Sequence, residues 1–137
     1  MTIKLKQSDY EAILAHAKTG LPNEACGLIA GTTADGVKTV EKVYLLTNTD
    51  NSREHFSIDP KEQLAAIKDM RSLGILPLGN FHSHPESPAR PSQEDIRLAF
   101  DPNASYLILS LDEEVPVLKA FQVQGGEVIL QTLEIVE

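Results

Sequence analysis

The chain has 137 residues, of which 42% are hydrophobic, and a formal net charge of −8 at pH 7. Its length suits a single domain over residues 1–137, and its apolar content is enough for a core, which excludes a disordered chain. The acidic balance argues against a nucleic-acid-binding protein, because phosphate contacts need clustered lysine and arginine side chains.

The cysteine content and the N-terminal residues of the chain indicate its cellular compartment. Cys26 is the only cysteine, so no internal disulfide can form, which fits a reducing cytoplasm. The N-terminal stretch becomes polar before the apolar core of a signal peptide could form, and no apolar run approaches the about 20 residues of a membrane span. We therefore expect a soluble cytoplasmic protein with no membrane partner.

The first part of the chain indicates a strand, a helix and a hairpin. Residues 2–5 suit a short strand, and Ser8 is a candidate N-cap for a helix with apolar residues on one side. The apolar run 26–31 predicts a buried strand, which an Asp-Gly turn connects to a return strand over 37–46.

The middle of the chain alternates between short apolar runs and a helix. Residues 55–58 alternate polar and apolar side chains, as a half-buried strand does. Asp59 and Pro60 suit the N-cap and the first helical position, and they predict a helix to about residue 73. The apolar run 75–81 then predicts another strand.

A third helix and three closing strands complete the predicted elements. The helix opens at Ser92 and places Ile96, Ala99 and Phe100 on one face. The closing strands are predicted over 105–111, 115–123 and 127–136. Mixed helices and strands that end in an antiparallel run predict one α+β domain.

The tripeptide His82-Ser83-His84 follows the apolar run 75–81 directly. Residues i and i+2 of a strand point to the same face with Cα atoms about 7 Å apart, so two imidazoles can converge on one metal ion. A pair of surface histidines in a loop is the alternative, and this short motif leaves it open.

Asp95 is a candidate third ligand, because a catalytic zinc site takes three protein ligands and leaves one position for water. The proline-rich turn PESPARP is stiff and could bring the first turn of the next helix back over the strand end. Ser92 and Asp95 also match an S-x-x-D capping box, in which the Asp95 carboxylate would bind the helix backbone instead of a metal. The residues by themselves leave both roles open.

A water-activating site also needs a general base, and periodicity places none of the 20 acidic residues near His82. Glu24 is notable only because it precedes a buried strand, and a solvent-exposed loop acid is the alternative. Cys26 with a histidine base would be a different, nucleophilic chemistry, but its position inside an apolar run favours a small buried side chain. His16 and His55 are expected at the surface.

Taken together, these residues resemble the motif of the JAMM metalloproteases, also called MPN-plus domains. That family carries an upstream Glu and then H-[ST]-H-P. Seven residues separate the second histidine from a Ser, and two residues separate that Ser from an Asp. Glu24, the run His82-Ser83-His84-Pro85, Ser92 and Asp95 match every position. The segments NEACGLIAG, HFSIDP and LGNFHSHP also resemble compact prokaryotic members.

The resemblance implies a curved mixed sheet, shaped as a partial barrel, with the three predicted helices around it. His82, His84 and Asp95 would hold one zinc ion per chain, with water as the fourth ligand. Glu24 would accept the proton of that water and pass it to the leaving amine, and Ser92 would steady the tetrahedral intermediate. Two imidazoles and a carboxylate also suit iron.

The activity that the resemblance implies is hydrolysis of a peptide or isopeptide bond at the C-terminal tail of a ubiquitin-like or sulfur-carrier protein. The enzyme would remove a C-terminal extension, an attached cysteine or a conjugated target. A catalytically silent MPN-type interaction module is the alternative, although the complete ligand set argues against it. The sequence does not indicate the oligomeric state.

Overall fold

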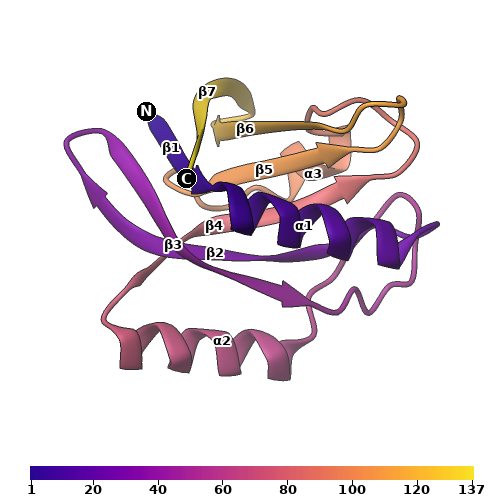
Figure 1. Ribbon diagram of the computed structural model, residues 1–137. Coiled ribbons are helices and arrows are strands. Elements are labelled where there is room, and N and C mark those ends of the chain that lie inside the picture. Colours follow the sequence, from indigo (N-terminus) through magenta and orange to yellow (C-terminus); the bar gives the residue numbers. More distant parts are fainter.

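The computed structural model describes residues 1–137 (Figure 1). Its elements follow one another in the order β1 (Thr2–Lys6), α1 (Gln7–Gly20), β2 (Cys26–Ala34), β3 (Val37–Leu46), α2 (Pro60–Leu73), β4 (Leu76–His84), α3 (Gln93–Arg97), β5 (Ser105–Ser110), β6 (Val117–Gln124) and β7 (Glu127–Val136). None of the three helices is long and apolar enough to cross a membrane.

The strands form one mixed sheet that closes into a barrel in the order β1-β3-β2-β4-β5-β6-β7. β1 lies parallel to both β3 and β7, and β4 lies parallel to β5, while the other neighbours are antiparallel. The predicted α+β fold, with a curved mixed sheet and three helices, is confirmed. Closure goes beyond the predicted partial barrel, because β1 fills the position between β3 and β7.

Two hydrophobic clusters hold the long helices against the sheet. The larger cluster packs α1, through Ile13 and Ala17, against side chains of β1 to β6, and the smaller one packs α2 against β2 and β3. Ile29 belongs to the larger cluster, whereas Leu28 and Ala30 belong to the smaller one. β2 is therefore buried on both faces, between α1 and α2 (Figure 1), which explains its continuous apolar run.

The predicted N-cap of α1 at Ser8 is wrong. The helix begins at Gln7, and its N-cap residue Lys6 makes no side-chain capping hydrogen bond. β1 pairs with β7 as far as Lys6, so the chain passes from strand to helix without a loop and Ser8 lies inside the first turn. Pairing between the two ends of the chain decides this boundary.

The other differences concern short segments. α3 ends at Arg97, so Ala99 and Phe100 lie outside it, and the Phe100 side chain is 84% exposed. No residue of α3 is buried, so no apolar face against the core supports another turn. The expected strand over 55–58 is reduced to one β-bridge between Ile58 and Asn48.

Candidate metal centre

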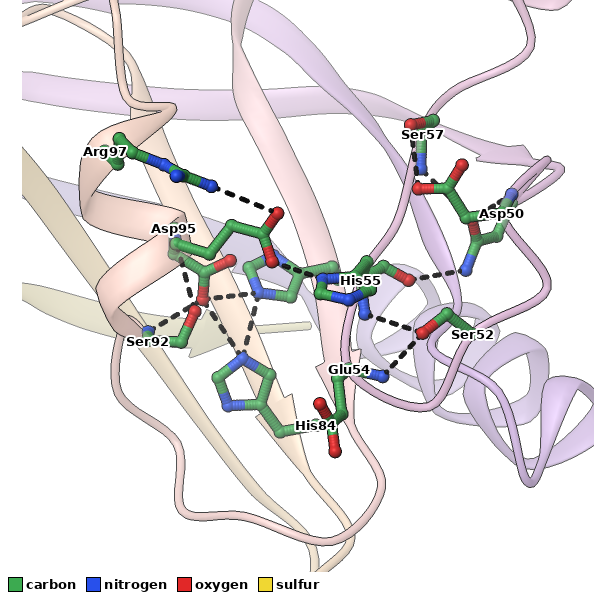
Figure 2. A network of polar contacts seen from close by, with 12 residues as sticks. Asp50, Ser52, Glu54, His55, Ser57, His84, Ser92, Asp95 and Arg97 are labelled. Atoms are coloured by element: carbon green, nitrogen blue, oxygen red, sulfur yellow. Dashed lines mark hydrogen bonds and ion pairs between the residues drawn. The ribbon is translucent and has the colours of Figure 1, made fainter.

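The three predicted ligands meet at the end of β4. Asp95 Oδ2 lies 3.2 Å from His84 Nε2 (Figure 2). His82 Nε2 lies 3.1 Å from His84 Nε2 and 3.2 Å from Asp95 Oδ2. A tetrahedral zinc site with bonds of about 2.0 Å places its ligand atoms about 3.3 Å apart, so this triangle fits three corners of such a site. These three residues could therefore hold a metal ion.

Strand geometry explains why the histidines converge. His82 and His84 are two positions apart within β4 and point to the same side of the sheet, where both are buried. β4 lies between β2 and β5, with His82 opposite Cys26 on one side and Ile108 on the other. The loop alternative for the two histidines is therefore wrong, since both belong to an internal strand.

Asp95 caps α3 and faces the histidines at the same time. The Ser92 N–H donates to Asp95 Oδ2 at 2.9 Å, and the Asp95 N–H donates to Ser92 Oγ at 3.0 Å, which completes the capping box. The oxygen that accepts the Ser92 bond is the one that lies against both imidazoles. Capping, which was expected to compete with metal binding for Asp95, thus leaves the carboxylate facing both imidazoles.

Hydrogen bonds and burial together set the protonation of His82, His84 and Asp95. His84 Nδ1 lies 2.9 Å from the Pro88 carbonyl, so this nitrogen donates and leaves the Nε2 lone pair free for a metal. Burial lowers the pKa of His82. Burial would raise the pKa of Asp95, but its contacts with His82 and His84 outweigh this effect and hold that pKa well below its usual range.

Glu24 is a buried acid, with 4% of its surface exposed, and not the exposed loop acid of the alternative. Ser83 of β4, between the two histidines, binds the segment that carries Glu24. Ser83 Oγ accepts from the Ala25 N–H at 2.8 Å, and the Ser83 N–H donates to the Ala25 carbonyl at 3.0 Å. Glu24 Oε1 makes no hydrogen bond within the chain, and burial raises the pKa of Glu24 to about 8.

Two cavities of about 430 Å³ each meet at the metal centre. One has no apolar lining residue and includes Glu24, His84 and Ser92. The other is largely apolar and includes His82 and Asp95, with Phe56, Leu98 and Phe100 among its walls. The ligand cluster therefore borders both a polar and an apolar space, and Glu24 shares the polar one with His84.

The remaining candidates take no part in this centre. Cys26 is buried, and burial raises the pKa of its thiol to about 12, which argues against the thiolate nucleophile. His16 is half-buried, contrary to the surface prediction, because its Nε2 contacts the carbonyls of Cys26 at 3.1 Å and Leu46 at 2.9 Å. His55 is exposed as predicted, and its ring contacts Glu94.

Three residues near the centre escaped prediction from sequence: Asn48, Phe56 and Ser83. The Asn48 side chain donates to the Glu24 carbonyl at 2.9 Å, and the Phe56 ring stacks on His82. Ser83 lies within the H-S-H motif, so its position was visible but its contact with Ala25 was not. No local pattern marks Asn48, which lies in an irregular segment. Its hydrogen-bond partners Glu24 and His55 are 24 and 7 positions away along the chain.

A family model of prokaryotic homologues of the JAB domain matches residues 6–124. The chain belongs to this family. Membership of the JAMM (MPN-plus) family, predicted from the spaced motif, is thereby confirmed.

This JAB-family chain is 32% identical to the CysO-cysteine peptidase of Mycobacterium tuberculosis, over 92% of this chain and 86% of the relative. It is 35% identical to a desampylase of Haloferax volcanii, over 80% of this chain and 81% of the relative. The predicted class of enzyme, a JAB-family hydrolase of the peptidase type, is therefore confirmed.

Solved structures agree with the fold. A protein from Desulfitobacterium hafniense superimposes with a TM-score of 0.89 at 53% identity, covering 98% of this chain and 95% of that one. A JAB1/MPN domain protein from Archaeoglobus fulgidus superimposes with a TM-score of 0.61 at 26% identity, over all of both chains. The JAB/MPN-like architecture predicted from sequence is confirmed.

Proposed function

We propose that this chain is a zinc-dependent hydrolase that cuts a peptide or isopeptide bond at the C-terminal tail of a ubiquitin-like or sulfur-carrier protein. The observation that carries the proposal is the buried Glu24 carboxylate, whose Oε1 has no partner and which shares a cavity with His84 and Ser92. The similarity to a CysO-cysteine peptidase and to a desampylase supports this class of substrate.

His82, His84 and Asp95 would hold the zinc ion, because their nearly equilateral triangle of ligand atoms fits a tetrahedral site. When bound, zinc supplies Lewis-acid polarisation of the scissile carbonyl and brings the pKa of water toward about 7. The Pro88 carbonyl keeps His84 in the tautomer that presents Nε2.

Glu24 moves the proton in this mechanism. Its free Oε1 takes a proton from the attacking water and later delivers it to the leaving amine. Burial favours the protonated carboxyl, so proton uptake is easy, while a cation at the nearby ligands favours the ionised form needed at the start. Both steps therefore lie within reach of one side chain near neutral pH.

Ser92 provides a hydrogen-bond donor. Its Oγ accepts from the Asp95 N–H in the capping box, which leaves the hydroxyl hydrogen available. The Ser92 side chain is exposed and lines the cavity that Glu24 lines, so the hydroxyl can donate to the oxyanion of the tetrahedral intermediate. The capping bond fixes the position of the hydroxyl oxygen.

The two cavities suit a chain-like substrate. An extended tail can occupy one cavity while the group beyond the scissile bond occupies the other, with the bond itself at the metal centre. A free, unpaired Cys26 agrees with a cytoplasmic location for this activity. A catalytically silent interaction module would have no use for a buried carboxylate oxygen without a partner, such as Glu24 Oε1.

The decisive experiment is Glu24→Gln, assayed on a carrier protein with a C-terminal extension. Loss of general acid–base catalysis should lower kcat by about 10²- to 10⁴-fold. Zinc content should stay at one per chain, because the three ligands are untouched, whereas His84→Ala should lose the metal.

The matched control is Glu134→Gln, which removes an exposed carboxylate from β7 outside both cavities. It should leave kcat and zinc content unchanged. Full activity of Glu24→Gln would rule out the role of Glu24, and a zinc-free wild-type protein without hydrolytic activity would favour the interaction module.

A further inference from the structure

We infer that Phe56 is a positioning residue for the metal centre: its ring holds the His82 imidazole in the orientation that presents Nε2 to Asp95 and His84. The two ring centroids lie 4.6 Å apart, and the ring planes are inclined by only 23°, which is a stacked arrangement. The inference rests on the metal-ligand roles proposed above and adds a residue outside the spaced motif.

The two histidines are anchored in different ways. His84 is held through Nδ1 by the Pro88 carbonyl at 2.9 Å, which is the usual way to orient a metal-ligating imidazole. His82 Nδ1 is buried and makes no hydrogen bond within the chain. Since the terminal torsion of histidine is soft, the His82 ring needs another restraint to keep one orientation. The face of Phe56 supplies that restraint.

The backbone on both sides of Phe56 is clamped by one side chain. Asn48 Nδ2 donates to the His55 carbonyl at 3.0 Å, and Asn48 Oδ1 accepts from the Ser57 N–H at 3.1 Å. The Thr49 N–H also donates to the Ser57 carbonyl at 2.9 Å. The residue that carries the stacking ring is therefore fixed, although it lies in an irregular segment.

The same amide connects this clamp to the proposed general base. Asn48 Nδ2 donates to the Glu24 carbonyl at 2.9 Å as well as to His55. One side chain thus sets the segment before β2 and the segment that carries Phe56 relative to each other. The geometry of His82 and the place of Glu24 are coupled through Asn48.

The test compares zinc dissociation constants, measured by chelator competition, and the visible spectrum of the cobalt-substituted protein. Phe56→Leu should weaken zinc binding by about 10-fold or more, as loss of an orienting partner does, and alter the cobalt bands. Phe56→Tyr keeps the ring and should restore wild-type affinity and spectrum. A role in general stability alone would not change the cobalt bands of a folded protein.

The matched control is Phe100→Leu, the same substitution in the same cavity at a ring that stacks on no histidine. It should leave zinc affinity and the cobalt spectrum unchanged. A folded Phe56→Leu protein with wild-type affinity and an unchanged cobalt spectrum would overturn the inference.

A measurement on the metal-free wild-type protein needs no variant. Proton NMR should show nuclear Overhauser contacts between the Phe56 and His82 rings and upfield shifts of the His82 carbon-bound protons, and their absence would overturn the inference. Failure of the wild-type protein to bind zinc would instead refute the proposed function, and the NMR result would still decide whether the rings stack.

Discussion

At the scale of single residues, Asp95 shows how one carboxylate oxygen serves two partners. Oδ2 lies 2.9 Å from the Ser92 nitrogen and 3.2 Å from each imidazole Nε2. A carboxylate oxygen has two lone pairs, so one can accept the helix N–H while the other faces a cation. The capping box therefore directs Oδ2 toward the imidazoles, so that capping is compatible with the proposed ligand role.

Substitution of Asp95 should separate these two roles. Asp95→Asn keeps an oxygen that can accept from Ser92 but removes the negative charge, whereas Asp95→Ala removes both. We expect both variants to lose zinc affinity by more than about 100-fold, because a ligand counts for more than an orienting partner. Only Asp95→Ala should also lose about 1 kcal/mol of unfolding free energy through the cap.

Isothermal titration with zinc and urea unfolding of the metal-free proteins near pH 8 measure the two effects. Equal unfolding free energies for the two variants would show that the cap contributes nothing, and wild-type zinc affinity in Asp95→Asn would remove Asp95 from the ligand set.

At the scale of elements, the positions of the two proposed histidine ligands depend on the close approach of β4 to β5. Gly79 of β4 lies opposite Ser105 of β5, three positions before His82. A Cβ atom at Gly79 would lie 1.8 Å from the Ser105 carbonyl oxygen, so no other residue fits without moving one strand. The register that brings His82 opposite Ile108 therefore needs a glycine at position 79.

Gly79→Ala should force β4 and β5 apart and lower the unfolding free energy by about 1–3 kcal/mol or more. Because the displaced strand carries both histidines, zinc affinity should fall together with stability. Thermal unfolding with and without zinc measures both quantities.

Gly20→Ala is the matched control, since its added Cβ would meet nothing closer than 3.6 Å. It should keep the wild-type melting temperature and zinc affinity. A Gly79→Ala protein as stable as this control would mean that the two strands are not in tight contact.

At the scale of the whole molecule, the site makes folding depend on pH in two opposite ways. Burial raises the pKa of Glu24 from 4.5 to about 8, so its favourable contribution to folding is complete below about 4.5 and is lost as pH rises through 8. The lowered pKa of Asp95 acts in the other direction, because its contribution is lost as pH falls. These two groups by themselves therefore give the metal-free protein its highest stability between 3.8 and 4.5, the ordinary pKa values of the two side chains.

Glu24→Gln should remove the alkaline loss of stability in the chelated protein. As pH rises from about 5 to about 9, the unfolding free energy of the variant should increase relative to wild type, on the order of a few kcal/mol. Zinc should reduce the difference, because a nearby cation favours the ionised Glu24. Urea unfolding at several pH values measures the trend, and parallel curves for the two proteins would contradict the buried, unpartnered carboxylate.

Sequence patterns determined those features that depend on neighbouring residues. Hydrophobic periodicity indicated the strands and the two long helices, and the Asp59-Pro60 signal placed the start of α2, where Asp59 does accept from the Lys61 N–H. Local geometry made convergence of His82, His84 and Asp95 possible, because an i, i+2 pair on a strand and an S-x-x-D helix start are both short-range patterns. Their role as a ligand set was implied only by the resemblance to the JAMM motif.

Tertiary structure alone decided the remainder. The burial of Glu24 depends on the contact between Ala25 and Ser83, which are 58 positions apart, and closure of the barrel depends on pairing between the first and last strands. The stacking of Phe56 on His82 depends on Asn48, whose contacts lie in an irregular segment without periodicity. Such contacts follow from strand register and chain closure, which are set by the packing of the whole molecule and leave no local signature in the sequence.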